Sequence, residues 1–277
     1  MSSCSTGGVS PTRDGRWSVR GLTDKVVLVT GGGYSPDQVG SGLGQSMCAE
    51  LAKEGAKVVV SDLSLERANA TVDRIRDAGG DAIGVAADVT DEASVHGMVS
   101  AAVDAYGHVD VLVNNAGVFG AYLPLLDIET SQWERVMEVD LKGVFLATKA
   151  TLPHMLERGS GVVINVSSAS GLVASEVGAE YTTAKHGVIG LTKQIAYDYG
   201  HRGIRAVGIG PGVIKTAAFE GAEITSDFPF YDLTMQAPAG RYGEPHEVAR
   251  AVCFLASDDA SFIHGHTIPV DGGSPIS

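Results

Sequence analysis

Three side chains that can handle protons occur in two short segments, Gly161 to Ser168 (GVVINVSS) and Tyr181 to Lys185 (YTTAK). The first segment is typical of a buried strand that ends in a hydroxyl, that of Ser168. The second predicts the start of a helix on which Tyr181 and Lys185, four positions apart, share one face. We therefore expect these three groups to lie within reach of one another.

The chemistry of such a cluster depends on positive charge near the tyrosine. An unperturbed tyrosine has a pKa near ~10, so at neutral pH it is a poor base unless a cation stabilises the phenolate. Lys185 supplies one cation, but one opposite charge changes a pKa by only roughly 1 to 3 units. Reaching neutrality calls for a second positive group, such as an oxidised nicotinamide ring. The residues therefore predict a cofactor.

Short β-branched runs alternate with helical patterns along the chain. The runs predict strands buried on both faces, as in parallel sheets, at 25–30, 57–61, 82–87, 109–114, 161–167, 204–210 and 266–270. Helices are predicted at 44–54, 65–78, 92–106, 131–157, about 181–199 and 245–256. This alternation predicts one α/β domain with a doubly wound, seven-stranded parallel sheet of the Rossmann-like type.

Glycines follow the first predicted strand and open the first predicted helix. Gly31 and Gly33 belong to the turn after Thr30, and Gly42, Leu43 and Gly44 begin the helix. Glycines here allow a pyrophosphate to approach backbone N–H groups at a helix N-terminus without a Cβ in the way. A glycine-rich turn alone is weak evidence for a nucleotide site.

Asp62 strengthens that prediction. It closes the second predicted strand eighteen positions after Gly44, where a carboxylate can accept hydrogen bonds from ribose hydroxyls. It could also cap the following helix, and both roles could hold at once. A phosphate about 4 Å from this carboxylate costs on the order of 4 kcal/mol at an effective dielectric near 20, and neither Ser61 nor Ser41 is a compensating cation. We therefore expect NAD(H) rather than NADP(H).

From about Lys25 to Gly273 the chain resembles the short-chain dehydrogenase/reductase family. The resemblance is carried by the motifs in order: Thr30 with its glycines, Asp62, Asp88-Val89, Asn114-Asn115-Ala116-Gly117, Ser168, Tyr181, Lys185, Pro211-Gly212, Thr216 and Pro269 to Gly273. By this resemblance Tyr181 is the acid/base at the substrate oxygen, and Ser168 hydrogen-bonds that oxygen. Lys185 holds the nicotinamide ribose and assists the tyrosine.

The resemblance also implies the cofactor contacts. Asp88 and Val89 flank the adenine, and Asn115 borders the cofactor near the fourth strand, together with its neighbours Ala116 and Gly117. The nicotinamide end is held by a segment after the sixth strand, comprising Pro211, Gly212, Val213, Ile214 and Thr216.

Two features depart from the family pattern. Seven extra residues, Tyr34 to Gly40, separate Gly33 from Ser41, and we expect them to form a flap over the adenosine half of the cofactor, with a tolerated surface loop as the alternative. Asp140 occupies the position of a usual asparagine, often counted as a fourth catalytic residue. In the family the main-chain carbonyl at that position holds a water on the lysine, and an aspartate preserves the carbonyl.

We interpret the chain as an NAD(H)-dependent oxidoreductase that interconverts a secondary alcohol and a ketone. Residues 217–240 are predicted to form a substrate lid, which contains Phe219, Phe228, Phe230, Tyr231, Leu233 and Met235 but no lysine or arginine. An uncharged, apolar substrate fits such a lid. The alternatives are a 3-ketoacyl-carrier-protein reductase, which would want basic residues at the mouth, and a non-catalytic nucleotide sensor, which would not need Ser168, Tyr181 and Lys185 together.

Composition limits the partners. The 277 residues are 44% hydrophobic, and a formal net charge of -13 disfavours nucleic acid and anionic membranes. We expect a flexible tail over 1–22 without a signal peptide, a catalytic domain over 23–277, a cytoplasmic location and a homotetramer. His264 and His266 lack a third ligand nearby, so no metal site is predicted.

Overall fold

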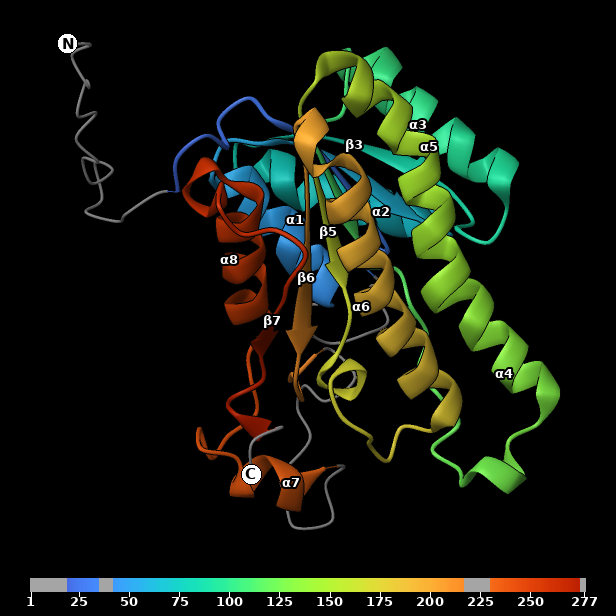
Figure 1. The fold of residues 1–277 in the computed structure, drawn as a ribbon. Coiled ribbons are helices and arrows are strands. Elements are labelled where there is room, and N and C mark those ends of the chain that lie inside the picture. Colours follow the sequence, from blue (N-terminus) through green and yellow to red (C-terminus); the bar gives the residue numbers. More distant parts are fainter. Residues whose placement is uncertain (1–18, 35–41, 217–229, 275–277) are drawn as a thin grey trace.

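Seven parallel strands form the centre of the molecule (Figure 1). The structure, a computed structural model, describes residues 19–34, 42–216 and 230–274. The strands lie in the order β3-β2-β1-β4-β5-β6-β7, which confirms the predicted doubly wound sheet. Their bounds are β1 Val26–Thr30, β2 Lys57–Asp62, β3 Asp81–Ala86, β4 Val111–Asn114, β5 Gly161–Val166, β6 Ile204–Pro211 and β7 Thr267–Val270.

Helices cover both faces of the sheet (Figure 1). Helices α1 (Leu43–Lys53), α2 (Leu65–Asp77) and α8 (Pro245–Ala256) pack on one face, and α3 (Glu92–Tyr106), α5 (Gly143–Arg158) and α6 (Ala179–Tyr199) on the other. Alternate residues of one strand enter the two cores, since Val27 and Val29 face α1 whereas Val26 and Leu28 face α3. This two-sided burial explains the continuous apolar runs of the sequence.

The long helix predicted over 131–157 is interrupted. Helix α4 (Thr130–Val136) passes into a π-helical turn, Met137–Lys142, before α5 begins. The prediction of one regular helix was therefore wrong at this point. The π-helical turn carries Asp140, whose side chain is completely buried, and such turns are frequent at functional sites.

Residues 19–22, which composition assigned to the tail, pack against the domain. Leu22 has no exposed surface, and the Arg20 guanidinium pairs with Asp259. The predicted tail therefore extends too far along the chain; its remaining residues lie outside those that the structure describes. Within the described ranges, no helix is long and apolar enough to cross a membrane.

Two predicted loops lie mostly outside the described residues. Of the segment from Tyr34 to Gly40, the structure describes Tyr34, and of the lid it describes 230–240, which include the short helix α7 (Tyr231–Gln236). Helix α7 lies beyond the carboxyl end of β6 in Figure 1. The described part of the predicted lid, residues 230–240, therefore lies near the edge of the sheet at which nucleotides bind in folds of this kind.

Candidate active site

The strand order reverses between β1 and β4, and polar contacts join these strands at their carboxyl ends. The Thr30 hydroxyl accepts hydrogen bonds from the backbone N–H groups of Asn115 (3.0 Å) and Ala116 (3.1 Å). The Asn115 amide donates to the carbonyls of Thr30 (2.9 Å) and Gly31 (3.0 Å). Asn115 and Ala116 therefore hold the glycine-rich turn at the place where doubly wound sheets bind nucleotides.

The turn and the start of α1 are shaped for close approach of backbone. Gly31 has φ +64°, which favours glycine, and a Cβ on Gly44 would lie 2.1 Å from the Gly31 carbonyl oxygen. Gly42 precedes α1 and has no side chain with which to cap it. The first N–H groups of the helix can therefore serve an anion, as a dinucleotide pyrophosphate requires.

We expect Gly44→Ala to weaken cofactor binding, because the added methyl must displace Gly31 from the turn. The dissociation constant for NADH should rise by at least about tenfold. Gly97→Ala is the matched control, since it adds the same methyl to α3 with nothing within 4 Å. Equal affinities of the two variants in fluorescence titration with NADH would remove this turn from the cofactor site.

Asp62, at the end of β2, is held by three donors. One carboxylate oxygen accepts from the Gly33 N–H (3.2 Å), and the other accepts from the Ser64 N–H (3.1 Å) and pairs with the Arg67 guanidinium at 2.9 Å. The cap of α2 is Ser64, whose hydroxyl accepts from the Arg67 N–H. Arg67 is therefore a cation beside this carboxylate, whereas Ser61 and Ser41, the residues considered from the sequence, carry no charge.

Tyr34, the first residue of the insertion, lies against α2. Its N–H donates to the Arg67 carbonyl (2.9 Å), and the guanidinium of Arg74 lies 3.7 Å from the centre of its ring. Residues 35–40 lie outside the described residues. The flap over the adenosine half remains a prediction, with Tyr34 fixed beside α2 at the base of the insertion.

Asp88 and Val89 follow β3 at the same edge of the sheet. Hydrogen bonds from the Thr90 N–H (2.9 Å) and then the Thr90 hydroxyl (2.7 Å) lower the pKa of Asp88. Val89 packs against the π-helical region, because a Cβ on Gly143 would lie 2.9 Å from a Val89 methyl. This places both residues at the sheet edge expected for the adenine, and their contact with it remains a prediction.

Tyr181 and Lys185 are buried on one face of the first turns of α6. The Lys185 ammonium lies 5.4 Å from the centre of the Tyr181 ring and donates to the Val166 carbonyl (3.3 Å). It also pairs with an Asp140 oxygen at 3.0 Å. Burial acts to lower the pKa of Lys185, but the charges of Tyr181 and Asp140 and the hydrogen bond to Asp140 outweigh it and raise this pKa. Lys185 is therefore a cation at neutral pH.

Ser168 follows β5, which buried polar contacts join to α6. The Asn165 amide donates to the Thr192 hydroxyl (2.9 Å), and the Ser167 hydroxyl donates to the Lys185 carbonyl (3.0 Å). The Ser168 hydroxyl accepts from the Ser170 N–H (3.1 Å) at the start of a short 3-10 helix, Ala169–Gly171. This helix packs on α6, as Gly171 shows: a Cβ there would lie 2.9 Å from the Lys185 carbonyl oxygen. Ser168 is thereby fixed relative to the helix of Tyr181.

Two buried carboxylates anchor the segment after β4. Asp140 accepts from the Val118 N–H (2.8 Å), and Glu180 accepts from the Ala121 N–H (2.5 Å). Glu180 has no exposed surface although it is adjacent to Tyr181 in sequence. Its burial could not be predicted from the sequence, since a glutamate in a first helical turn is ordinarily solvated.

The anchored segment carries aromatic rings to Tyr181. The ring centre of Phe119 lies 6.0 Å from that of Tyr181 and 6.5 Å from that of Tyr122, and Tyr122 lies 6.0 Å from Phe230 of the predicted lid. Phe119 and Tyr122 are both exposed. We call Phe119, Tyr122 and Phe230 the aromatic wall; it offers an apolar surface beside the phenol.

The segment predicted to hold the nicotinamide end leaves the carboxyl end of β6. The Gly212 N–H donates to the Val270 carbonyl (3.0 Å), and Val213 and Lys215 pair with the backbone of Gly243. Ile214 forms a bridge with the same glycine, and Thr216 is the last described residue before the lid. This backbone pairing fixes residues 211–216 at the edge of the sheet.

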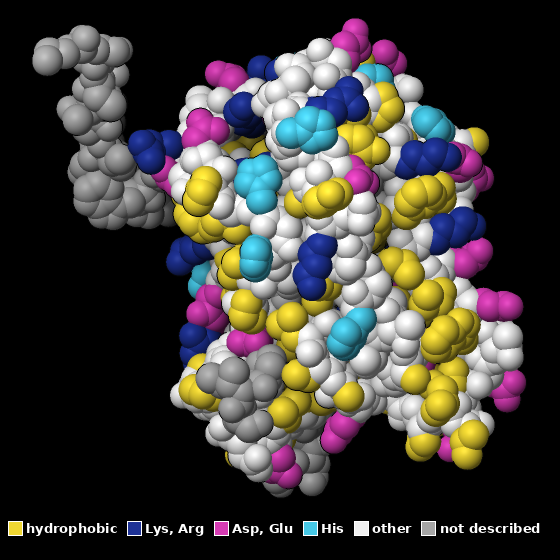
Figure 2. Space-filling view, in the orientation of Figure 1, with side chains coloured by type: hydrophobic (Ala, Val, Ile, Leu, Met, Phe, Trp, Pro, Cys, Tyr) yellow, Lys and Arg dark blue, Asp and Glu magenta, His cyan; other side chains and the backbone are white. Residues whose placement is uncertain are grey.

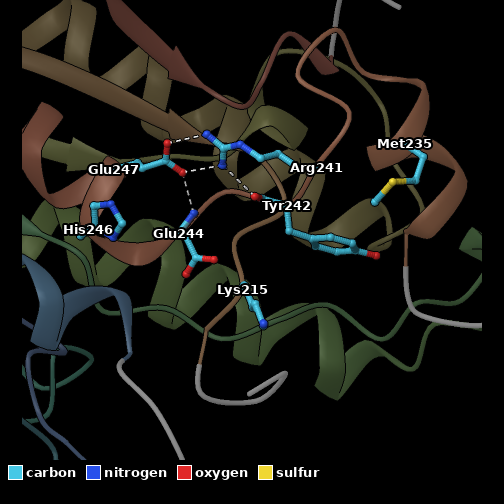
Figure 3. Close-up of a pocket in the computed structure, with 7 residues that line it drawn as sticks. All are labelled: Lys215, Met235, Arg241, Tyr242, Glu244, His246 and Glu247. Carbon is cyan, nitrogen blue, oxygen red and sulfur yellow. Dashed lines mark hydrogen bonds and ion pairs between the residues drawn. The ribbon is translucent and has the colours of Figure 1, made fainter. Parts of the chain in front are cut away.

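A pocket of about 450 Å³ lies beside this segment, lined by Lys215, Met235, Arg241, Tyr242, Glu244, His246 and Glu247. Figure 3 shows the Arg241 guanidinium held between the Glu247 carboxylate and the Tyr242 carbonyl, with nitrogen-to-oxygen distances of 2.7 to 3.0 Å. Tyr181 does not line it. Within this pocket the charge of Arg241 is already paired.

Comparisons with known proteins place the chain in a family. A family model described as enoyl-(acyl carrier protein) reductase matches residues 39–274. The chain is 38% identical over 259 residues to levodione reductase of Leifsonia aquatica, covering 91% of this chain and 94% of that protein. It is also 38% identical over 251 residues to cyclohexanol dehydrogenase of Acinetobacter sp. (strain SE19), with coverages of 91% and 95%.

A solved structure of one of these relatives also matches the fold of this chain. A crystal structure of levodione reductase matches with a TM-score of 0.83 and 37% identity, covering 92% of this chain and 99% of that chain. The chain belongs to the short-chain dehydrogenase/reductase family, as its motifs predicted. It is an oxidoreductase that acts on CH–OH donors, in a family that generally uses NAD(P).

Proposed function

We propose that the protein is an NAD(H)-dependent oxidoreductase that interconverts a cyclic, uncharged secondary alcohol and its ketone. The observation that carries this proposal is the buried Tyr181–Lys185 pair beside an apolar aromatic wall. The names of the relatives, levodione reductase and cyclohexanol dehydrogenase, support a ring-shaped substrate. Flat apolar rings pack well against aromatic side chains.

Each catalytic side chain has a separate part in the proposed mechanism. When bound, the nicotinamide cofactor supplies the acceptor or donor of the hydride. The Tyr181 phenolate takes the hydroxyl proton during oxidation, and the Tyr181 phenol gives a proton to the carbonyl oxygen during reduction. The Ser168 hydroxyl donates to that oxygen and orients it. Lys185 stabilises the charge that develops on Tyr181, and it binds the ribose hydroxyls.

The choice of NAD(H) is supported by Asp62. Its carboxylate lies against Gly33, at the end of β2, where it can accept from ribose hydroxyls and repel a phosphate. The pairing with Arg67 weakens that repulsion without removing the acceptor oxygens. We therefore retain NAD(H) as the proposed cofactor.

The basic residues on either side of the predicted lid give little support to a carrier-bound substrate. Lys215 and Arg241 flank the lid in sequence, but the Arg241 charge is paired with Glu247. A phosphopantetheine arm and an acidic carrier protein would need basic groups at the mouth. The non-catalytic alternative is disfavoured because a nucleotide sensor has no use for a buried tyrosine–lysine pair.

A substrate screen tests the proposed function. Cyclic, aromatic and steroidal secondary alcohols are each mixed with NAD⁺ or NADP⁺, and the absorbance of the reduced cofactor is followed. We expect turnover with cyclic alcohols and NAD⁺. Reduction of a 3-ketoacyl thioester by NADH or NADPH, without oxidation of any alcohol in the screen, would establish the carrier-linked alternative. NADH binding without turnover of any substrate would establish the sensor.

We also expect a homotetramer built on the long helices. A groove of about 670 Å³ runs over α4 and α5 and is lined in part by Trp133, Met137, Leu141 and Phe145. Figure 2 shows hydrophobic side chains gathered near α4, where Leu125 and Leu126 are exposed. Apolar surface of this kind favours contact with a second copy of the chain.

A further inference from the structure

The two carboxylate oxygens of Asp140 have two different partners. One accepts from the Val118 N–H at 2.8 Å, and the other lies 3.0 Å from the Lys185 ammonium. Asp140 has no exposed surface, and Lys185 is 4% exposed. A charged pair so far from water requires close opposite charge and hydrogen bonds, and this site provides both.

An asparagine could not make both contacts. Its side chain has one acceptor oxygen, and its nitrogen only donates, as does the lysine ammonium. If the amide oxygen accepted from the Val118 N–H, the amide nitrogen would face the Lys185 ammonium, and both of these groups are donors. Gly117 leaves the room for the carboxylate, because a Cβ there would lie 2.8 Å from the Asp140 oxygen. The surroundings of residue 140 therefore favour a carboxylate.

We propose that Asp140 is a positioning residue that sets the protonation state of Tyr181 through Lys185. Its charge offsets that of the ammonium, so Tyr181 keeps its proton to higher pH than it would beside an unpaired lysine. At neutral pH Tyr181 is then ready to act as the acid in ketone reduction, and alcohol oxidation needs more alkaline solution. This inference rests on the proposed function, because it concerns the pH dependence of that reaction.

Other ionisable groups lie near Tyr181, and the Asp140 variants described below leave these residues unchanged. Tyr122 comes from the segment after β4, and Glu180 lies on α6 itself, near the same segment. Phe119 and Phe230, from the segment after β4 and the start of α7, carry no charge. Asp140→Asn therefore changes the charge next to Lys185 while its side-chain oxygen can still accept from the Val118 N–H, which anchors the segment of the aromatic wall.

The first test compares pH profiles of kcat/KM for cyclohexanol oxidation with NAD⁺. In Asp140→Asn and Asp140→Ala, the pH of half-maximal activity should fall by about one unit or more. Glu138→Gln is the matched control, since it removes an exposed carboxylate of the same π-helical turn that pairs with Lys142. Its midpoint should match that of the unmodified protein. A purely structural role would lower kcat at every pH without moving the midpoint.

A second test needs no turnover. The ultraviolet absorbance of the Tyr181 phenolate is titrated with NAD⁺ bound, as the difference between each protein and its Tyr181→Phe derivative. The midpoint should be lower in both Asp140 variants than in the unmodified protein. Equal midpoints, or higher ones, would overturn the proposal. If the unmodified protein oxidises no alcohol, the proposed function fails, whereas this titration still decides the role of Asp140.

Discussion

Tyr181→Phe is expected to fold, to bind NADH and to lose nearly all turnover. The substitution removes only the hydroxyl that transfers the proton, and it keeps the ring that packs 6.0 Å from Phe119. General acid/base catalysis contributes typically about 10²- to 10⁴-fold, so kcat should fall by that factor while the affinity for NADH stays within about twofold. Steady-state kinetics and a binding titration measure the two effects.

Tyr122→Phe provides the matched control for Tyr181→Phe. It removes the hydroxyl of a neighbouring ring of the aromatic wall, and burial followed by the charge of Tyr181 raises the pKa of that hydroxyl. We expect kcat to remain within about threefold of the unmodified value, because this residue has no part in proton transfer. Retention of a tenth of kcat by Tyr181→Phe would contradict the acid/base role of Tyr181.

The sheet could be predicted from the sequence because the apolar pattern that identifies each strand lies within that strand. Runs such as Val26 to Thr30 are buried on both faces, so their pattern is continuous and hard to mistake. The spacing of Tyr181 and Lys185 likewise needs only helical geometry, and both side chains are buried on α6. Contacts within one element or one turn are therefore the part of the site that could be predicted.

The remaining features depend on contacts between distant segments. The π-helical turn at Met137–Lys142 interrupts a sequence with ordinary helical periodicity, and its Asp140 has partners on the segment after β4 and on α6. The burial of Glu180 depends in the same way on the Ala121 N–H, which is 59 positions away. No periodicity in a single sequence records such pairings, since each requires the assembled fold.

The pairing of Arg67 with Asp62 gives cofactor choice a second determinant. In the unmodified protein, kcat/KM should favour NAD(H) over NADP(H) by at least about a hundredfold, which is less than the full repulsion of a phosphate by a carboxylate allows. We expect less than the full repulsion because the Arg67 guanidinium lies 2.9 Å from that carboxylate and offsets part of its charge. Equal use of both cofactors would remove Asp62 from the ribose site.

Asp62→Ala should therefore do more than weaken NAD(H) binding. It removes the acceptor for the ribose hydroxyls and leaves the Arg67 guanidinium without its partner, so that guanidinium can pair with a 2′-phosphate. We expect the preference for NAD(H) to fall to about tenfold or less, with part of the change due to better use of NADP(H). The double variant Asp62→Ala with Arg67→Ala separates the two effects, because it lacks both the carboxylate and the guanidinium. If NADP(H) is used equally well by the single and double variants, Arg67 does not face the phosphate and only Asp62 governs the choice.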